Sequence, residues 1–241
     1  MIAGTTAFLP HVQNQTRNVV IRSENPTGVR GHAIFLHRAW VDLEDVEWRD
    51  LGRTTVAPLD VTKYEIYNGE PRPVSIGTNQ IGRYAGPHAH HLVGPQDPIR
   101  DGACAALPLG CSFVLRGNSV WQTQEMRTKF GVVVHHSSFG RVEGNVVYRV
   151  AGTGIALEDG YEYRNTVRGN AVTRANGSGD GVNPRNNARP VDLGHAGDGI
   201  GSFGFASNDI SGNIVANVAQ AGYDFWSVTY GESQPGIKVI K

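Results

Sequence analysis

The residues best suited to chemistry in this chain are a group of histidines and a pair of acidic residues. His88 and His90 are two residues apart, a spacing that puts both imidazoles on one face of a strand. His135 ends a run of valines, and Glu158 and Asp159 end a similar apolar run 23 residues later. Imidazoles and carboxylates bind divalent metals and also serve as general bases and acids. The residue types alone allow either a metal centre or metal-free acid–base chemistry.

A repeated dipeptide indicates how these distant residues could meet. Gly-Asn recurs at intervals of 27, 25 and 43 residues, each time before small or β-branched residues. The copies are Gly117-Asn118, Gly144-Asn145, Gly169-Asn170 and Gly212-Asn213. Short strands separated by Gly and Asn turns at such a period are typical of a stacked solenoid, because both residues tolerate the positive φ of a sharp bend. Stacked asparagines would form a ladder of side-chain hydrogen bonds.

The glycine before each apolar run sets the register of the coils. The run that begins at Gly131 superposes on the run that begins at Gly154, and later runs begin at Gly199 and Gly222. In this register His135 lies beside Glu158, and the strand with the two earlier histidines belongs to the preceding coil. Adjacent parallel strands lie about 4.8 Å apart, so we expect these side chains to gather at one edge.

We therefore predict an all-β protein folded as a single-stranded right-handed parallel β-helix, since parallel crossovers are right-handed. One domain would span residues 1–241, as a segment of a longer protein. Three stretches lack strand alternation and are predicted to be long inserted loops, at about 53–80, 94–110 and 174–194. A β-propeller is the alternative, but it needs four strands and about 40 residues per repeat.

Composition and charge exclude some partners. The formal net charge is zero, which argues against a nucleic-acid-binding protein. No apolar run is long enough to cross a bilayer, and no signal peptide is visible at the start of the chain. Cys104 and Cys111 could form a disulfide across a loop or remain two thiols. The oligomeric state does not follow from the sequence.

Cationic and aromatic residues near the histidines are candidates for substrate binding. Arg83 and Tyr84 precede the first histidines, while Arg127 and Arg141 flank His135. Arginine pairs bidentately with carboxylate or sulfate, as an acidic polysaccharide would require. Trp226 offers a ring for stacking on a sugar, although it could instead be part of the apolar cap of the last coil.

Several short motifs occur in one order along the chain. They are Thr16-Arg17-Asn18-Val19-Val20-Ile21, Arg30-Gly31-His32, Trp48-Arg49-Asp50-Leu51-Gly52-Arg53, Gly82-Arg83-Tyr84 before His-x-His, Val134-His135, Gly144-Asn145-Val146-Val147-Tyr148 and Leu157-Glu158-Asp159-Gly160. In this order they resemble the β-helix region of the cell-migration-inducing hyaluronidase family, which includes transmembrane hyaluronidase and fibrocystin-like proteins. The resemblance runs from Thr16 to Gly160 and is weaker beyond.

The resemblance implies a right-handed parallel β-helix, an extracellular or secreted location, and a polysaccharide substrate or ligand related to hyaluronan. By motif it selects the residues already singled out: His88, His90, His135, Glu158 and Asp159. Some animal members are associated with calcium-dependent depolymerisation of hyaluronan. We therefore expect a divalent metal, calcium or a transition metal, with His88, His90, His135 and Glu158 as ligands. One additional residue separates Arg-Tyr from the histidines here, so His91 could replace His90.

The leading hypothesis is an extracellular enzyme that degrades an acidic, hyaluronan-like polysaccharide, with hydrolysis favoured over elimination. In a hydrolase, Glu158 and Asp159 would act as acid and as base or nucleophile. In a lyase, His135 would remove the proton beside a uronate carboxylate that arginine or a metal neutralises. The alternatives are a non-catalytic glycan-binding or adhesion module and a purely structural solenoid.

Overall fold

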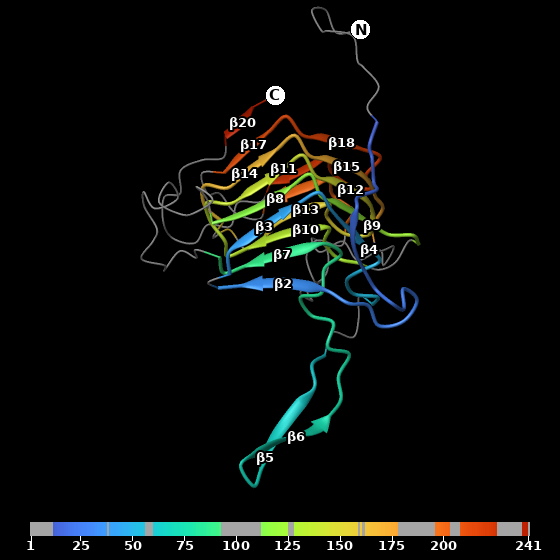
Figure 1. Cartoon of the computed structure of the whole chain (residues 1–241), viewed down its shortest axis with the longest axis vertical. Coiled ribbons are helices and arrows are strands. Elements are labelled where there is room, and N and C mark those ends of the chain that lie inside the picture. Colours follow the sequence, from blue (N-terminus) through green and yellow to red (C-terminus); the bar gives the residue numbers. More distant parts are fainter. Residues whose placement is uncertain are drawn as a thin grey trace, which may run out of the picture.

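The computed structural model describes residues 12–37, 39–55, 60–92, 112–124, 128–158, 160, 162–177, 196–202, 208–225 and 238–240 of the chain. All regular secondary structure in these residues is β. Three six-stranded parallel sheets form the body of the protein, and one antiparallel hairpin projects from it (Figure 1). Successive strands belong to different sheets, so the chain passes through all three before it returns one rung further on. The parallel β-helix is confirmed.

Each sheet takes one strand from each rung. Sheet A contains β1 (Val19–Arg22), β4 (Val46–Arg49), β9 (Ser119–Trp121), β12 (Val146–Val150), β15 (Ala171–Ala175) and β18 (Ile214–Ala216). Sheet B contains β2 (Ala33–Leu36), β7 (Pro87–His90), β10 (Val132–His135), β13 (Ile155–Glu158), β16 (Ile200–Ser202) and β19 (Tyr223–Phe225). Sheet C contains β3 (Val41–Glu44), β8 (Phe113–Arg116), β11 (Arg141–Glu143), β14 (Thr166–Arg168), β17 (Asp209–Ser211) and β20 (Lys238–Ile240).

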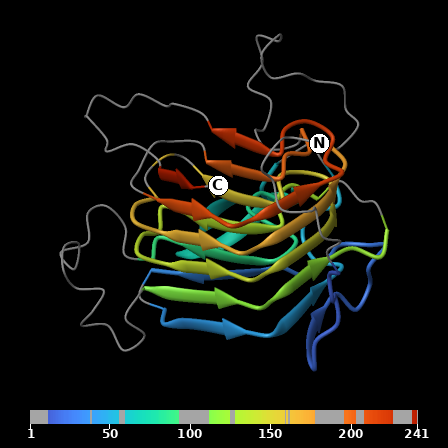
Figure 2. The ribbon, with the colours of Figure 1, turned by 90° about the horizontal axis from the view of Figure 1, so that it is seen from above.

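The core is a continuous column of apolar side chains inside the coil, and Figure 2 shows the strands stacked around it. Each sheet contributes one or more rows of buried residues, a row being the set of residues that are register partners on successive rungs. In sheet A the row is Trp48, Val120, Val147 and Val172, all with no exposed surface. In sheet B, Val132, Ile155 and Ile200 form a comparable row. Because successive strand residues alternate in direction, the residues next to these rows point outward.

The glycines that set the register in sequence are explained by close approach between rungs. A Cβ atom on Gly131 would collide with the carbonyl oxygen of Gly154, and a Cβ on Gly154 would lie 2.8 Å from the carbonyl oxygen of Gly199. These glycines directly precede the strands of sheet B. A side chain there would push two rungs apart, so the residue must be glycine. The predicted pairing of the strands that begin at Val132 and Ile155 is confirmed.

The predicted asparagine ladder is also confirmed. Asn145 Oδ1 accepts hydrogen bonds from the backbone N–H and the side chain of Asn118, at 2.9 and 3.1 Å. Asn145 in turn donates to Asn170 Oδ1, and its Nδ2 also reaches the carbonyl of Leu115. Asn170 repeats the pattern with Asn213. The glycine before each asparagine has a φ between 62° and 64°, as a left-handed bend requires.

A second ladder, between sheets B and C, was not predicted. The backbone N–H of Gly140 donates to Asn165 Oδ1, and both the backbone and the side chain of Asn165 donate to Asn208 Oδ1. These asparagines follow Arg164 and Ser207 rather than glycine. The Gly-Asn dipeptide therefore could not reveal them.

The interpretation of residues 53–80 as a loop without strands is wrong. This stretch contains the antiparallel hairpin of β5 (Lys63–Tyr67) and β6 (Glu70–Ser75), all of whose residues are exposed. Pro71 and Pro73 in β6 stand opposite Ile66 and Tyr64. The proposed loop at 94–110, both cysteines and most of the loop at 174–194 lie outside the described residues.

We expect Asn145→Ala to lower the free energy of unfolding by about 2 to 4 kcal/mol, because it leaves the buried N–H of Asn118 and the carbonyl of Leu115 without partners. Urea unfolding measures the loss. Asn213→Ala, in the half-exposed ladder position, should cost clearly less because water can replace the amide there. Equal losses at both positions would contradict a stabilising role for burial of the ladder.

Candidate functional site

The predicted residues lie on the outer face of sheet B, at the ends of three successive strands. His90, His135 and Glu158 are register partners on β7, β10 and β13. His88 lies two residues earlier on β7 and faces the same way. The residues between them, such as Ala89 and Val134, are fully buried in the core. The alternation that fills the core thus turns all four functional side chains outward.

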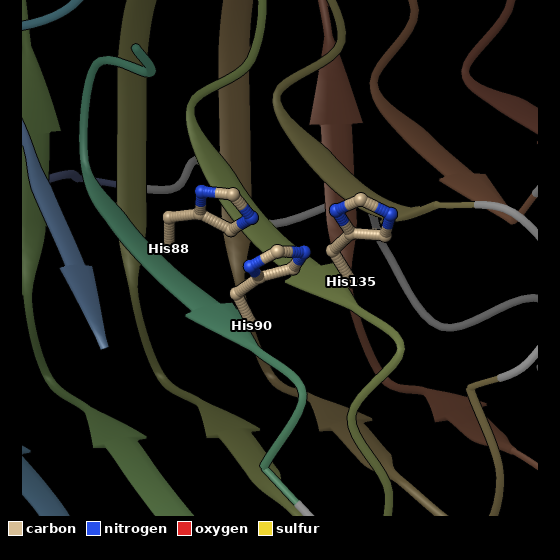
Figure 3. A group of neighbouring side chains, drawn as sticks. All are labelled: His88, His90 and His135. Carbon is tan, nitrogen blue, oxygen red and sulfur yellow. The ribbon is translucent and has the colours of Figure 1, made fainter. Parts of the chain in front are cut away.

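Three histidines form a compact group. Each of His88, His90 and His135 offers a ring nitrogen within 4.8 Å of the nitrogens of the other two. The ring centroids of His90 and His135 are 4.4 Å apart, and those of His88 and His90 are 5.0 Å apart. Figure 3 shows the three rings turned toward one another from two neighbouring strands. Among the described residues this is the group of histidine, cysteine and acidic side chains that could hold a metal ion.

His88 is the most buried of the three, with 2 % of its surface exposed. Neither ring nitrogen makes a hydrogen bond of normal geometry with the described residues, although the backbone of Gly82 is close enough to influence the ring. Burial, reinforced by the charges of His90 and His135, lowers the pKa of His88 to about 3. The ring is therefore neutral at pH 7, which is the form in which imidazole binds a metal. Buried polar atoms without partners are costly, and here they face two other imidazoles.

Glu158 lies beside the histidines and is held by two further side chains. The hydroxyl of Tyr84 donates to Glu158 Oε2 at 3.1 Å, and Lys129 Nζ lies 3.2 Å from Oε1. His135 Nδ1 is 3.9 Å from Oε2. Ligand atoms about 2.1 Å from one ion lie about 3 to 4 Å apart, so this distance is compatible with Glu158 as a fourth ligand. It is equally compatible with a carboxylate that only contacts His135.

Lys129 also belongs to this site, although the sequence did not predict it as a functional residue. Its side chain is 5 % exposed, and its ammonium lies 4.5 Å from the ring centre of Phe130. Phe130, Tyr84, Val133 and Ala156 form a small apolar cluster on the outer face of sheet B. The segments that precede β7 and β10 therefore cover this face and bring Lys129 against Glu158. A lysine that precedes a strand does not indicate in the sequence that the chain folds back over the sheet.

Two further histidines continue the group toward solvent. His91 and His136 follow the two histidine-bearing strands, and both have a positive φ, of 56° and 49°. His91 Nε2 and His136 Nδ1 are 3.2 Å apart. The backbone N–H of His136 donates to the buried Glu162. Burial, together with the charges of His135 and His37, lowers the pKa of His91.

The donor set suits a transition metal. Imidazole nitrogens are preferred by zinc, copper, iron and nickel, whereas calcium takes six to eight oxygen ligands. The three histidines supply nitrogen, and Glu158 is the described carboxylate next to them. Of the two metal classes that we expected, a transition metal therefore fits this group better.

The remaining predicted residues are less closely gathered. Arg83 is half-buried, and its Nη1 donates to the carbonyl of Arg30. Tyr84 is 5 % exposed, so a role in substrate binding would fall to its hydroxyl. Arg141 begins a strand of sheet C, so it does not share the face with the histidines. Asp159, Arg127 and Trp226 lie outside the described residues.

Comparison with known families gives one match. A family model described as the CEMIP β-helix matches residues 75–197, just over half of the 241-residue chain. The match includes all three clustered histidines and Glu158. No curated protein and no solved structure matches the chain. In the described part of the chain, no helix has the length and apolar character needed to cross a membrane.

The low pKa of His88 predicts a pH effect on the metal-free protein. The unfolded chain takes up a proton near pH 6.5, whereas folded His88 does so only near pH 3. His88 therefore makes no pH-dependent contribution above about pH 6.5, where it is neutral in both states, and it lowers the free energy of unfolding progressively as the pH falls from 6.5 toward 3. Urea unfolding with a chelator present should show His88→Leu to be less pH-dependent than the wild type in this window, by up to about 1.4 kcal/mol per pH unit. Identical pH dependence would contradict a neutral, buried His88.

Proposed function

Because the chain belongs to the CEMIP β-helix family, we propose that it is an extracellular enzyme that degrades an acidic, hyaluronan-like polysaccharide at the histidine cluster of sheet B. Family membership indicates a function that acts on glycans related to hyaluronan, and hence a polysaccharide partner. We further propose that the protein degrades this glycan, that it does so by hydrolysis, and that it is secreted. The convergence of His88, His90 and His135 beside Glu158 is the observation that supports catalysis most directly.

This convergence is not needed for the fold. The core inside the coil is complete without these side chains, because they all lie on the outer face of sheet B. Placing His88 and Lys129 in a nearly water-free position costs stability, since buried polar groups lose hydration. A buried histidine with a lowered pKa, such as His88, is typical of functional sites. A purely structural solenoid does not need such groups.

In this proposal His88, His90 and His135 hold a transition metal. Such an ion would act as a Lewis acid that lowers the pKa of bound water and neutralises an adjacent carboxylate of the substrate. The neutral state of His88 suits the binding of a metal. The apolar cluster of Tyr84, Phe130, Val133 and Ala156 excludes water from one side of the histidines.

Glu158 is the group that we assign to proton transfer. Tyr84 and Lys129 fix both of its oxygens, and the ammonium of Lys129 offsets the carboxylate charge. An oriented carboxylate can take a proton from the water that attacks the anomeric carbon while a second acid protonates the departing sugar oxygen. Asp159, the next residue, is the proposed second acid. In this route the bond between the anomeric carbon and the glycosidic oxygen breaks, and the remainder of the glycan chain leaves with the proton from the second acid.

Elimination is the competing chemistry. There His135 would take the proton beside the uronate carboxylate, and the glycosidic oxygen would leave to give an unsaturated product. The hydroxyl of Tyr84 near Glu158 is a possible proton donor to that oxygen. An ultraviolet-absorbing product would support the lyase, and a saturated product the hydrolase. Binding without any new reducing ends would support a glycan-binding module instead.

We expect a chelator to abolish the release of reducing ends from hyaluronan and a transition metal to restore it. Calcium should restore it poorly, because the donors are mainly imidazole nitrogens. The His88→Ala variant should lose bound metal, measured by elemental analysis, as well as activity. Full activity after exhaustive chelation would remove the metal from the proposal.

Glu158→Gln should reduce kcat by about 10²- to 10⁴-fold, the range for loss of a general base or acid. The substitution also removes the carboxylate that pairs with the buried Lys129, so the double variant Glu158→Gln with Lys129→Met keeps the test independent of folding. The double variant should recover thermal stability but not activity. Glu143→Gln on sheet C is the matched control and should behave as the wild type. Wild-type turnover in the Glu158→Gln variant would overturn the assignment.

A further inference from the structure

A second outward-facing row, on sheet A, combines arginines with aromatic rings. Its members are register partners on successive rungs: Arg22, Arg49, Trp121, Tyr148 and Thr173. The next residue inward on each of the last four strands is fully buried, so these side chains point away from the core. The row runs along the axis of the solenoid, with one residue at each rung of about 4.8 Å. None of these residues was among the candidate site residues predicted from the sequence.

The two rings of this row contact guanidinium groups, one from Arg49 in the row and the others from Arg149 and Arg174, which directly follow Tyr148 and Thr173. The guanidinium carbon of Arg49 lies 5.4 Å from the ring centre of Trp121, and that of Arg149 lies 5.2 Å from the ring centre of Tyr148. Arg149 and Arg174 each donate to the hydroxyl of Tyr148 at 3.4 Å. The hydrogen bond from Arg174, together with Arg149, lowers the pKa of Tyr148. The centre of the row is thus strongly cationic.

Arg149 and Arg174 occupy bends where arginine is an unusual residue. Their φ angles are 56° and 60°, in the left-handed region that favours glycine and asparagine. The corresponding bends of sheet A at other rungs carry Asp50 and Asn217, which suit that conformation. The arginines therefore cost stability at these positions. Strained residues of this kind cluster at binding and catalytic sites.

The N-terminal segment borders this row. The hydroxyl of Thr173 donates to Gln13, the hydroxyl of Ser119 donates to the carbonyl of Gln15, and the backbone of Arg17 donates to Glu47. Figure 1 shows this segment, in blue, running beside β15, β12, β9 and β4. It covers the neighbouring row of Glu47 and Ser119. The row of arginines and rings lies between this segment and the bends of Arg149 and Arg174. Glu47 contacts the row, with its carboxylate 3.3 Å from Arg49.

We propose that this row is a second binding site for an acidic polysaccharide, separate from the histidine cluster on sheet B. Guanidinium groups pair bidentately with carboxylate or sulfate, and the two rings offer apolar faces to sugars. A linear polyanion along the solenoid axis would meet a cation or a ring at each of the first five rungs, the fifth being supplied by Arg174 beside Thr173. The site would hold a long chain on the enzyme between successive cleavages. The inference shares the glycan class of the proposed function but does not require turnover.

The test measures binding of size-defined hyaluronan by calorimetry in the inactive Glu158→Gln background. The double variant Arg149→Asn with Arg174→Asn removes two charges and places at both bends a residue that suits a left-handed φ, so it should fold with an unchanged or higher Tm. We expect its Kd to rise about tenfold or more at low salt. Arg149→Lys with Arg174→Lys should retain part of the affinity, because charge remains while bidentate pairing is lost.

The matched control is Arg116→Asn with Arg168→Asn, two exposed arginines of sheet C that change the net charge equally. The Kd of this control for hyaluronan should equal that of the Glu158→Gln parent. Chondroitin sulfate in parallel shows whether sulfate or carboxylate is the preferred anion, and neutral dextran should not bind. Wild-type affinity in the Arg149/Arg174 variant, equal loss in the sheet C control, or tighter binding of single-stranded DNA than of any glycan would each overturn the proposal. Turnover on sheet B is measured separately, so its absence would not affect this result.

Discussion

The close contact between successive rungs constrains the rest of the structure. Glycine backbones meet with no room for a side chain at Gly131 and Gly154, and Asn145 links its rung to both neighbouring rungs through the hydrogen bonds of its side chain and its backbone N–H. Together these contacts leave no freedom for one rung to slip along another. The backbone contacts between rungs therefore fix the distance between outward-facing side chains. That is why imidazoles from separate rungs lie 4.4 Å apart without a dedicated scaffold around them.

The two outer faces use this regularity differently. On sheet B, folded-back segments bury part of the face, so His88 and Lys129 lie in a medium that strengthens their electrostatic interactions. On sheet A, the arginine and aromatic row remains half-exposed and linear. The buried arrangement suits chemistry on one bond of a substrate. The open arrangement suits contact with many repeating units.

The sequence predicted the parts of the structure that depend on neighbouring rungs. The glycines before each run gave the pairing of β10 with β13, and the Gly-Asn dipeptides gave the first ladder. Residues placed by non-repeating segments were missed, as Lys129 shows, because its position depends on how the chain before β10 returns over sheet B. The hairpin was missed because its strands are exposed on both faces and β6 contains two prolines, so neither alternation nor composition marked it. Arg149 and Arg174 were missed because arginine does not normally mark a bend.

The two prolines of β6 have a consequence for how the protein behaves at high concentration. A proline fits opposite a strand partner only where its missing N–H would have pointed away from that partner. Pro71 and Pro73, opposite Ile66 and Tyr64, therefore remove donors from the outer edge of the hairpin. An incoming strand from another molecule finds no regular set of donors on that side. The β6 edge of the projecting arm is in this way a poor template for another strand, even though the arm carries exposed tyrosine and isoleucine side chains.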